Sequence, residues 1–170
     1  MSDMALGLKC AAVICVLKSR DTNKYLLLKR NKNPHFDKYI PVGGKLEPFE
    51  TPDAAAKREL FEETGILECD LKLHGIMTET SPVKYNWILY IYTGVVDEFL
   101  PGFCDEGTLE WVSEKTILDL PTPTTDWFIY KLLLEGRAFI LDAHYDADLN
   151  LLFLRDEVEG IVLYNSKKNV

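Results

Sequence analysis

Three glutamates, Glu59, Glu62 and Glu63, stand close together in the first half of the chain. Spacings of three and four residues place side chains on one face of an α-helix, so we expect the three carboxylates to project together. Like charges held this close repel one another, and a divalent cation would remove that repulsion. Carboxylate oxygens suit Mg²⁺, with Mn²⁺ as an alternative. The sequence therefore predicts a site for a hard divalent cation.

The residues around these glutamates carry the signals of a helix that would hold them. Thr51 suits the N-cap, and Pro52 follows at the first helical position, where its missing N–H group costs nothing. Asp53 adds a negative charge near the positive end of the helix dipole. Gly65 suits a helix end in the left-handed conformation. We expect a helix that begins after Thr51 and ends at Gly65.

Arg58 lies one residue off the acidic face, where it is placed to pair with Glu50 or Glu62 and hold them in position. An isolated acidic helix face usually has a structural explanation, because charged residues four apart form ion pairs in solvent. Here a glycine loop, Glu50 and Arg58 accompany the acidic residues at defined spacings. The cation site is therefore the interpretation that we favour over a solvated acidic face.

The pattern is complete at nine positions: Gly44, Glu50, Arg58, Glu59, Leu60, Glu62, Glu63, Gly65 and Ile66. These positions match the Nudix box with no gap or substitution, so the chain resembles the Nudix hydrolases, the MutT-like pyrophosphohydrolases. The resemblance implies a mixed β-sheet between helices. It also implies an enzyme that uses Mg²⁺, with Mn²⁺ as the alternative, to hydrolyse phosphoric anhydrides.

The resemblance assigns metal binding to an oxygen-rich set: the Gly43 carbonyl, Glu59, Glu62, Glu63 and Glu106. Within that set, Glu59 or Glu106 would take the proton of the attacking water. Arg58 and Glu50 would orient the acidic cluster. Glu106 is included because Glu106–Val112 resembles the MutT-type loop in which a glutamate precedes an aromatic-containing strand. An ordinary loop acid is the alternative for this residue.

The rest of the chain resembles the bacterial MutT-type enzymes that sanitise oxidised nucleotides, with departures. Pro123 occupies the position of a tryptophan that related 8-oxo-purine hydrolases carry, and Ile40 stands where some of them use an asparagine. Asp126 alone remains of their acidic pair. We expect Asp126 either to hydrogen-bond a purine edge or to cap the last long helix.

Basic residues gather just before the glycine pair. The run Lys29–Lys38 is polar and basic, in a chain whose net charge is -8. Lys29, Arg30, Lys38 or Lys45 is predicted to contact substrate phosphates. Each of them is equally compatible with a solvated basic loop.

Length and composition are those of an ordinary globular protein, with 47% hydrophobic and 27% charged residues. Residues 1–170 are predicted to form a single domain. The net charge of -8 argues against a nucleic-acid polymer as partner, but a small phosphorylated substrate bridged by metal is compatible with it. The four cysteines have no zinc-ligand spacing and are predicted to be buried free thiols in a reducing cytoplasm. No signal-peptide pattern is present, and the apolar run Ala11–Leu17 is too short to span a bilayer.

Strands and helices are predicted to alternate, which favours an α+β fold, an α/β sandwich. The expected strands cover residues 8–17, 25–28, 39–42, 70–80, 86–96, 109–112, 139–145 and 150–155. A short helix is predicted to start with Ser113 as its N-cap, and a long one to cover residues 126–135. Residues 166–170 are expected to fray.

Together these features predict a cytoplasmic, Mg²⁺-dependent hydrolase that converts a nucleoside triphosphate to the monophosphate and pyrophosphate. An oxidised nucleotide such as 8-oxo-dGTP is the leading substrate, which would give a role in nucleotide pool sanitation. One alternative is a pyrophosphatase of ADP-ribose or a nucleotide sugar. Another is a non-catalytic module that senses a nucleotide. No membrane or nucleic-acid partner is expected, and the protein is predicted to be a monomer or a homodimer.

Overall fold

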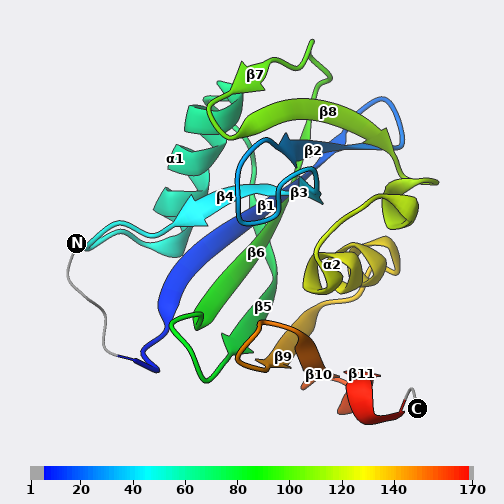
Figure 1. The fold of residues 1–170 in the computed structure, drawn as a ribbon. Helices are drawn as coiled ribbons and strands as arrows, with labels where there is room; N and C mark the ends of the chain where they lie inside the picture. The colour runs from blue at the N-terminus through cyan, green and yellow to red at the C-terminus, as the bar shows by residue number, and fades with distance from the viewer. Residues whose placement is uncertain (1–5, 169–170) are drawn as a thin grey trace.

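The computed structural model describes residues 6–168, which fold around one mixed β-sheet (Figure 1). Within these residues the sheet has 11 strands. In chain order they are β1 (Cys10–Ser19), β2 (Lys24–Arg30), β3 (Tyr39–Ile40), β4 (Val42–Lys45), β5 (Lys72–Thr80), β6 (Trp87–Val96), β7 (Phe103–Cys104), β8 (Gly107–Ser113), β9 (Phe139–Tyr145), β10 (Leu151–Asp156) and β11 (Ile161–Asn165).

The strand order is β11-β10-β9-β5-β6-β1-β2-β8-β7, with β3 paired to β2 and β4 paired to β1. β1 is central, because it runs parallel to β6 and antiparallel to both β2 and β4. Its pairing with β4 places Gly43 opposite Ile14 and Gly44 opposite Val13. The glycine pair is therefore fixed to the middle of the sheet.

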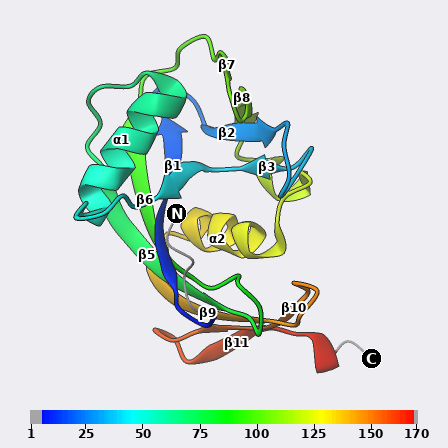
Figure 2. The same ribbon diagram turned by 60° about the vertical axis from the view of Figure 1, so that its left-hand side comes forward.

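Two α-helices cover opposite faces of the sheet, α1 (Pro52–Thr64) and α2 (Thr124–Leu134) (Figure 2). Two short 3₁₀ helices complete the fold, η1 (Ile117–Asp119) and η2 (Ser166–Lys168). Leu60 of α1 packs in one hydrophobic cluster with Cys15 of β1, whereas Tyr130 of α2 packs in another with Val16. Since successive strand residues point to opposite faces, β1 supplies side chains to both cores.

The helix that carries the glutamates has the ends that the sequence predicts. The Thr51 side chain accepts a hydrogen bond from the Ala54 amide at 3.3 Å, and Pro52 is the first helical residue. Gly65 has a left-handed backbone, with φ of 77°, and its amide bonds to the Phe61 carbonyl. Local signals at both ends therefore define α1.

The predicted fold class is confirmed, while several element boundaries are wrong. Gly43 and Gly44 belong to β4 and not to a loop. Ser113 ends β8 and is no helix N-cap, because the only helix nearby is η1, whose N-cap position is Thr116. The second long helix begins at Thr124, two residues before the predicted start. β11 was not predicted, although its first residues, Ile161–Tyr164, are rich in strand formers and it pairs with β10.

Among the described residues, no helix is both long and apolar enough to cross a membrane. No disulfide joins the cysteines within residues 6–168. Cys15 is buried, but Cys10, Cys69 and Cys104 are only partly buried, so the prediction of buried thiols is wrong for these three.

Candidate active site

Arg58 of α1 organises the acidic residues around it. Its Nε and Nη2 atoms donate to the two carboxylate oxygens of Glu50, each at 2.9 Å. Its Nη1 atom donates to Glu59 at 2.7 Å and lies 3.4 Å from Glu62. The Lys45 carbonyl accepts a further bond at 3.0 Å. A planar guanidinium can make these contacts at once, so Arg58 joins the loop before α1 to the acidic face of the helix.

The pairing with Arg58 holds the pKa of Glu50 at about 2, with help from the Glu47 amide. Glu50 is therefore ionised across the physiological range. This geometry agrees with the expectation that Arg58 and Glu50 hold the acidic cluster in position.

The glycine pair of β4 brings bare backbone against two of the helix glutamates. The Gly43 amide donates to the Glu63 carboxylate at 3.0 Å. A Cβ atom on Gly44 would lie 2.3 Å from a carboxylate oxygen of Glu59, so a side chain at this position would displace that carboxylate. The absence of a side chain at Gly44 therefore lets the Glu59 carboxylate lie against β4.

Burial, with added repulsion from neighbouring carboxylates, raises the pKa of Glu59 and of Glu63. Burial raises the pKa of Glu63 to about 7, and the charges of Glu59 and Glu106 add to the effect, while the Gly43 amide opposes it. Burial also raises the pKa of Glu59, against its ion pair with Arg58. Glu106, from the turn between β7 and β8, is thus close enough to interact with both helix glutamates.

Arg30 lies at the edge of the same cluster. Its guanidinium forms an ion pair with Glu106, and its side chain is only 13% exposed. The Glu106 carbonyl also accepts a bond from the Asn31 amide at 3.0 Å. The structure therefore brings Arg30 and Glu106 together beside the carboxylates of α1.

The donor set fits a hard divalent cation in its chemistry, since it offers oxygen atoms and repelling, partly buried negative charges. Within residues 6–168, however, no group of three or more His, Cys, Asp or Glu side chains already converges as a ligand set. Each carboxylate has another partner: Arg58 for Glu59, the Gly43 amide for Glu63 and Arg30 for Glu106. Shared binding of a cation would require these side chains to turn from those partners.

Two of the predicted phosphate-binding lysines lie elsewhere. Lys29 pairs with Asp37 at 3.2 Å and lies over the Tyr39 ring at 5.6 Å. Lys45 lies over the Trp87 ring at 5.4 Å. Gly44 faces Glu59, and Lys45 is the next residue of β4, paired with Ala12 of β1. Because successive residues of a strand point to opposite faces, the Lys45 side chain lies on the face away from Glu59. The structure places neither lysine within the acidic cluster.

Asp126 lies on the α2 side of the sheet, and it does not cap its helix. The N-cap position of α2 is Pro123, and no side-chain cap bond is present. Asp126 is 8% exposed. Burial, followed by the charge of Glu79, raises its pKa to about 8, whereas Lys38 opposes the shift. A buried acid beside a second acid is a candidate for contact with substrate.

Sequence reasoning missed Glu79. This residue of β5 is 2% exposed and accepts a hydrogen bond from the Tyr145 hydroxyl at 2.6 Å. The sequence carried a signal for this residue. Met77 and Glu79 are two residues apart on one strand, so the charged side chain points to the same inward face as the apolar one. The partner residues could not be found in this way, since they come from distant segments.

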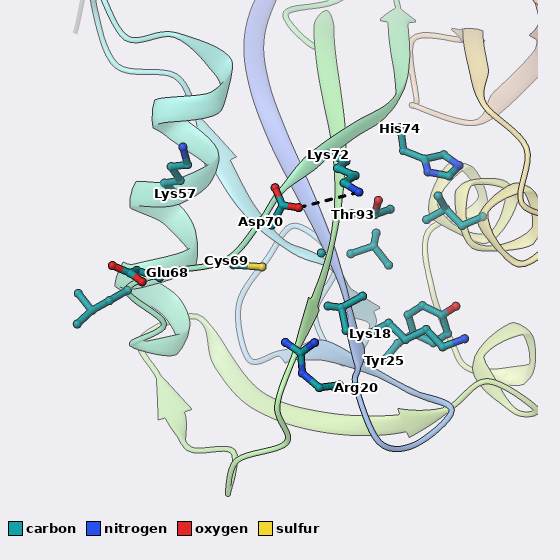
Figure 3. Close-up of a pocket in the computed structure, with 15 residues that line it drawn as sticks. Lys18, Arg20, Tyr25, Lys57, Glu68, Cys69, Asp70, Lys72, His74 and Thr93 are labelled. Atoms are coloured by element: carbon teal, nitrogen blue, oxygen red, sulfur yellow. Dashed lines mark ion pairs between the residues drawn. The ribbon is translucent and has the colours of Figure 1, made fainter.

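A hollow of about 890 Å³, shown in Figure 3, is lined by none of the predicted site residues. Its basic residues include Lys18, Lys57 and Lys72. They pair with Glu114 at 2.7 Å, Asp53 at 2.7 Å and Asp70 at 3.9 Å, respectively. Because these charges are already balanced, we do not assign the hollow to the chemistry of the acidic cluster.

The mixed sheet and α1 thus hold an acidic cluster beside a glycine pair, and comparison with known proteins identifies the family. The model for the NUDIX domain matches residues 8–133. The chain belongs to the Nudix family and is a hydrolase of phosphoric anhydrides. Divalent metal ions are the general cofactors of that family.

Curated and solved relatives agree with this assignment. Mouse diphosphoinositol polyphosphate phosphohydrolase 3-alpha is 30% identical over 135 residues, which cover 75% of this chain and 79% of the relative. The Nudix hydrolase YvcI of Bacillus subtilis is 28% identical over 155 residues, 86% of this chain and 94% of the relative. The crystal structure of a MutT protein from Bacillus halodurans has a TM-score of 0.76 and 28% identity, and the match covers 88% of this chain and 98% of that one.

Proposed function

We propose that this Nudix hydrolase is a Mg²⁺-dependent pyrophosphohydrolase whose preferred substrate is a nucleoside triphosphate, with oxidised nucleotides such as 8-oxo-dGTP as leading candidates. The observation that carries the proposal is the Arg58 network, which holds Glu50 and Glu59 beside the glycine pair of β4. The reaction would be attack of water on a bridging phosphorus, with release of a nucleoside monophosphate and pyrophosphate.

Mg²⁺, or Mn²⁺ in its place, would be held by an oxygen set: the Gly43 carbonyl, Glu59, Glu62, Glu63 and Glu106. The chemistry that a bound cation supplies is Lewis-acid polarisation of the phosphoryl oxygens. Glu59 or Glu106 would accept a proton from the attacking water at a carboxylate oxygen. Arg58 and Glu50 would keep the Glu59 carboxylate oriented during that transfer.

Basic residues would complete the contacts with substrate phosphates. Arg30 is the best placed, because it already lies against Glu106 at the edge of the acidic cluster. Lys29 would reach a phosphate only after breaking its ion pair with Asp37, and Lys45 only after moving away from the Trp87 ring. Arg30→Ala is therefore expected to raise KM more than Lys29→Ala does.

The head group of the substrate would lie on the α2 side, at Asp126. A nearly buried carboxylate without a cap bond suits an N–H donor of a nucleobase. A hydrogen bond from the base to Asp126 does not depend on the tryptophan that related enzymes carry at the position of Pro123.

A substrate panel tests the proposal. Phosphate release would be measured with added pyrophosphatase, with and without Mg²⁺, on canonical and oxidised nucleoside triphosphates. We expect cation-dependent release, with 8-oxo-dGTP above dGTP. ADP-ribose and nucleotide sugars belong in the same panel, and direct monophosphate products from them would move the function to that alternative. No turnover on any substrate would support a nucleotide-sensing module.

A second candidate substrate class is the diphosphoinositol polyphosphates. The 30% identity with mouse diphosphoinositol polyphosphate phosphohydrolase 3-alpha over 79% of that relative favours it. Phosphate release from a diphosphoinositol polyphosphate, faster than from any nucleotide in the panel, would replace the nucleoside triphosphate as the proposed substrate.

A further inference from the structure

An ion pair between Arg30 and Glu106 closes one side of the acidic cluster. Arg30 is the last residue of β2, and Glu106 lies in the turn between β7 and β8. The Nη1 atom of Arg30 donates to a carboxylate oxygen of Glu106. The arginine side chain is 13% exposed and that of Glu106 is 46% exposed, so the arginine is the more enclosed partner. Within residues 6–168 this is the only ion pair that Arg30 forms.

The backbones of the two residues are fixed against each other. Arg30 is the partner of Gly107 in the β2–β8 register, and the Asn31 amide donates to the Glu106 carbonyl at 3.0 Å. A Cβ atom on Gly107 would lie 2.0 Å from the Lys29 carbonyl oxygen, so the turn lies directly against β2. An exchange of partners by Arg30 would therefore require rotation of side chains and no movement of strands.

The charge of Arg30 acts on the carboxylates of α1 as well. Burial raises the pKa of Glu63 to about 7, and the charge of Glu106 adds to the rise, whereas Arg30 acts against it. Burial also raises the pKa of Glu59, and the charge of Glu106 adds to that shift. Arg30 thus offsets part of the repulsion among these carboxylates, which is also what a divalent cation would do.

Arg30 and Arg58 differ in how firmly they are held. Arg58 donates two bonds of 2.9 Å to Glu50, so it would stay in place if its other acidic partners turned away. Among the described residues, the Arg30 side chain has Glu106 and a long contact of 3.4 Å from Nε to the Lys32 carbonyl. A guanidinium has five N–H donors, so loss of Glu106 would leave most of them available. Phosphate oxygens suit such a planar set of donors.

We infer that the Arg30 side chain alternates between two partners: the Glu106 carboxylate in the free protein, and a substrate phosphate once a divalent cation has bound Glu106. The inference rests on the proposed function, because it concerns the same cation and the phosphates of the same substrate. Arg30 competes with the cation in the free protein and binds the substrate in the complex. Since such coupling is reciprocal, the cation and the phosphate each favour the binding of the other.

The first test is cation binding to the free protein, measured by calorimetry with Mn²⁺ as the probe and with no nucleotide present. Arg30→Gln is expected to bind Mn²⁺ about 5-fold more tightly than the wild type, because the competing charge on Glu106 is gone. The variant is expected to fold, since the β2–β8 ladder uses the backbone of Arg30 and Glu106 stays half-exposed to water. Unchanged or weaker Mn²⁺ binding would overturn the inference.

Two further variants separate the contact from a general effect of charge. Lys29→Gln removes the same charge one residue away, but Lys29 pairs with Asp37 at 3.2 Å, so we expect Mn²⁺ binding to change little. In a Glu106→Gln background, Arg30→Gln is expected to give no further tightening, because the shared carboxylate is absent. Equal tightening by Lys29→Gln, or equal tightening in both backgrounds, would overturn the inference.

A measurement on the wild type needs no variant. A guanidinium held in an ion pair rotates slowly, which keeps its Nη–H signals separate in ¹⁵N NMR spectra. The signals of Arg30 are expected to merge at saturating Mg²⁺, whereas those of Arg58 should stay separate, because Glu50 continues to hold it. Separate Arg30 signals at saturating Mg²⁺ would overturn the inference even if Arg30→Gln did not fold.

Kinetics of the full enzyme distinguish this inference from the proposed function. At saturating Mn²⁺, Arg30→Gln is expected to raise KM for a nucleoside triphosphate about 10-fold with a smaller change in kcat. The cation would then bind more tightly and the substrate more weakly, whereas a structural defect would weaken both. Tighter Mn²⁺ binding in a protein that hydrolyses no nucleoside triphosphate would reject the proposed function and keep the competition at Glu106. Hydrolysis by the wild type, with Mn²⁺ affinity unchanged in Arg30→Gln, would do the reverse.

Discussion

At the scale of single residues, the bidentate contact of Arg58 with Glu50 explains why the acidic cluster has one arrangement. Arg58 spans the loop before α1 and the helix face, and it also neutralises part of the charge on Glu59. A lysine would keep the positive charge but offers no planar fork. The shape of this side chain, and not its charge alone, is therefore expected to matter.

Arg58→Lys is expected to weaken activation by Mg²⁺ by roughly 10–100-fold, as loss of an orienting partner of a metal ligand typically does. The measurement is the Mg²⁺ concentration at half-maximal rate. Lys57→Arg is the control, because Lys57 pairs with Asp53 on another flank of α1 and has no contact with Glu50. An equal loss in both variants would show that the effect is not due to the Arg58 network.

Glu62→Gln is expected to lower kcat by a factor on the order of 100 or more, since a cation contributes several kcal/mol to catalysis of this type. The fold should be unaffected, because the Glu62 side chain is 55% exposed and its contact with Arg58 is 3.4 Å long. Steady-state rates and a thermal melt measure the two effects. Near-normal turnover would remove Glu62 from the proposed metal-binding set.

At the scale of elements, the approach of β4 to α1 positions the site. Gly44→Ala would place a Cβ atom 2.3 Å from a Glu59 carboxylate oxygen, so the carboxylate must move. We expect a large loss of kcat with a small change in Tm, because the displaced group is a side chain and not the core. Gly102→Ala is the control, since a Cβ atom there meets nothing within 4 Å. Full activity of Gly44→Ala would mean that the position of Glu59 is not critical.

Element ends were predictable where local signals fix them. Thr51, Pro52 and Gly65 define α1 from within a few residues, and both ends agree with the structure. β4 was mistaken for a loop because Gly43 and Gly44 have poor strand propensity, and only the pairing with β1 makes them a strand. Ser113 carried a cap signal, but the ladder between β2 and β8 extends through it.

At the scale of the whole molecule, the sheet separates two groups of acidic residues. The α1 face carries the acidic cluster, whose spacing along one helix made it visible in the sequence. The α2 face carries Asp126, Glu79 and Trp87, which come from one helix and two strands. The β5–β6 hairpin pairs Glu79 with Trp87, and the packing of α2 places Thr125, the neighbour of Asp126, 3.5 Å from the Glu79 carboxylate. The acidic cluster on α1 could thus be predicted from the sequence, whereas the surroundings of Asp126 required the fold.

The buried carboxyl group of Asp126 on the α2 face predicts how the stability of the protein depends on pH. In the folded protein the pKa of Asp126 is raised to about 8, first by burial and then by the charge of Glu79, from an ordinary value of 3.8. The folded state therefore favours the protonated form, so Asp126 increasingly opposes folding as pH rises from about 4 to about 8. Lys38 acts in the opposite direction, and the neighbouring phenols of Tyr85 and Tyr130 stay neutral in this range.

Asp126→Asn carries no charge that folding must suppress, so its stability should lack this pH dependence. At pH 4 the two proteins should melt at similar temperatures, and at pH 8.5 the variant should melt about 3 °C or more higher, since 1 kcal/mol shifts Tm by roughly 2–4 °C at this size. The quantity to compare is the Tm difference at each pH, because the other titrating groups are common to both proteins. A difference that is constant with pH, or that favours the wild type at pH 8.5, would mean that Asp126 is ionised in the folded state.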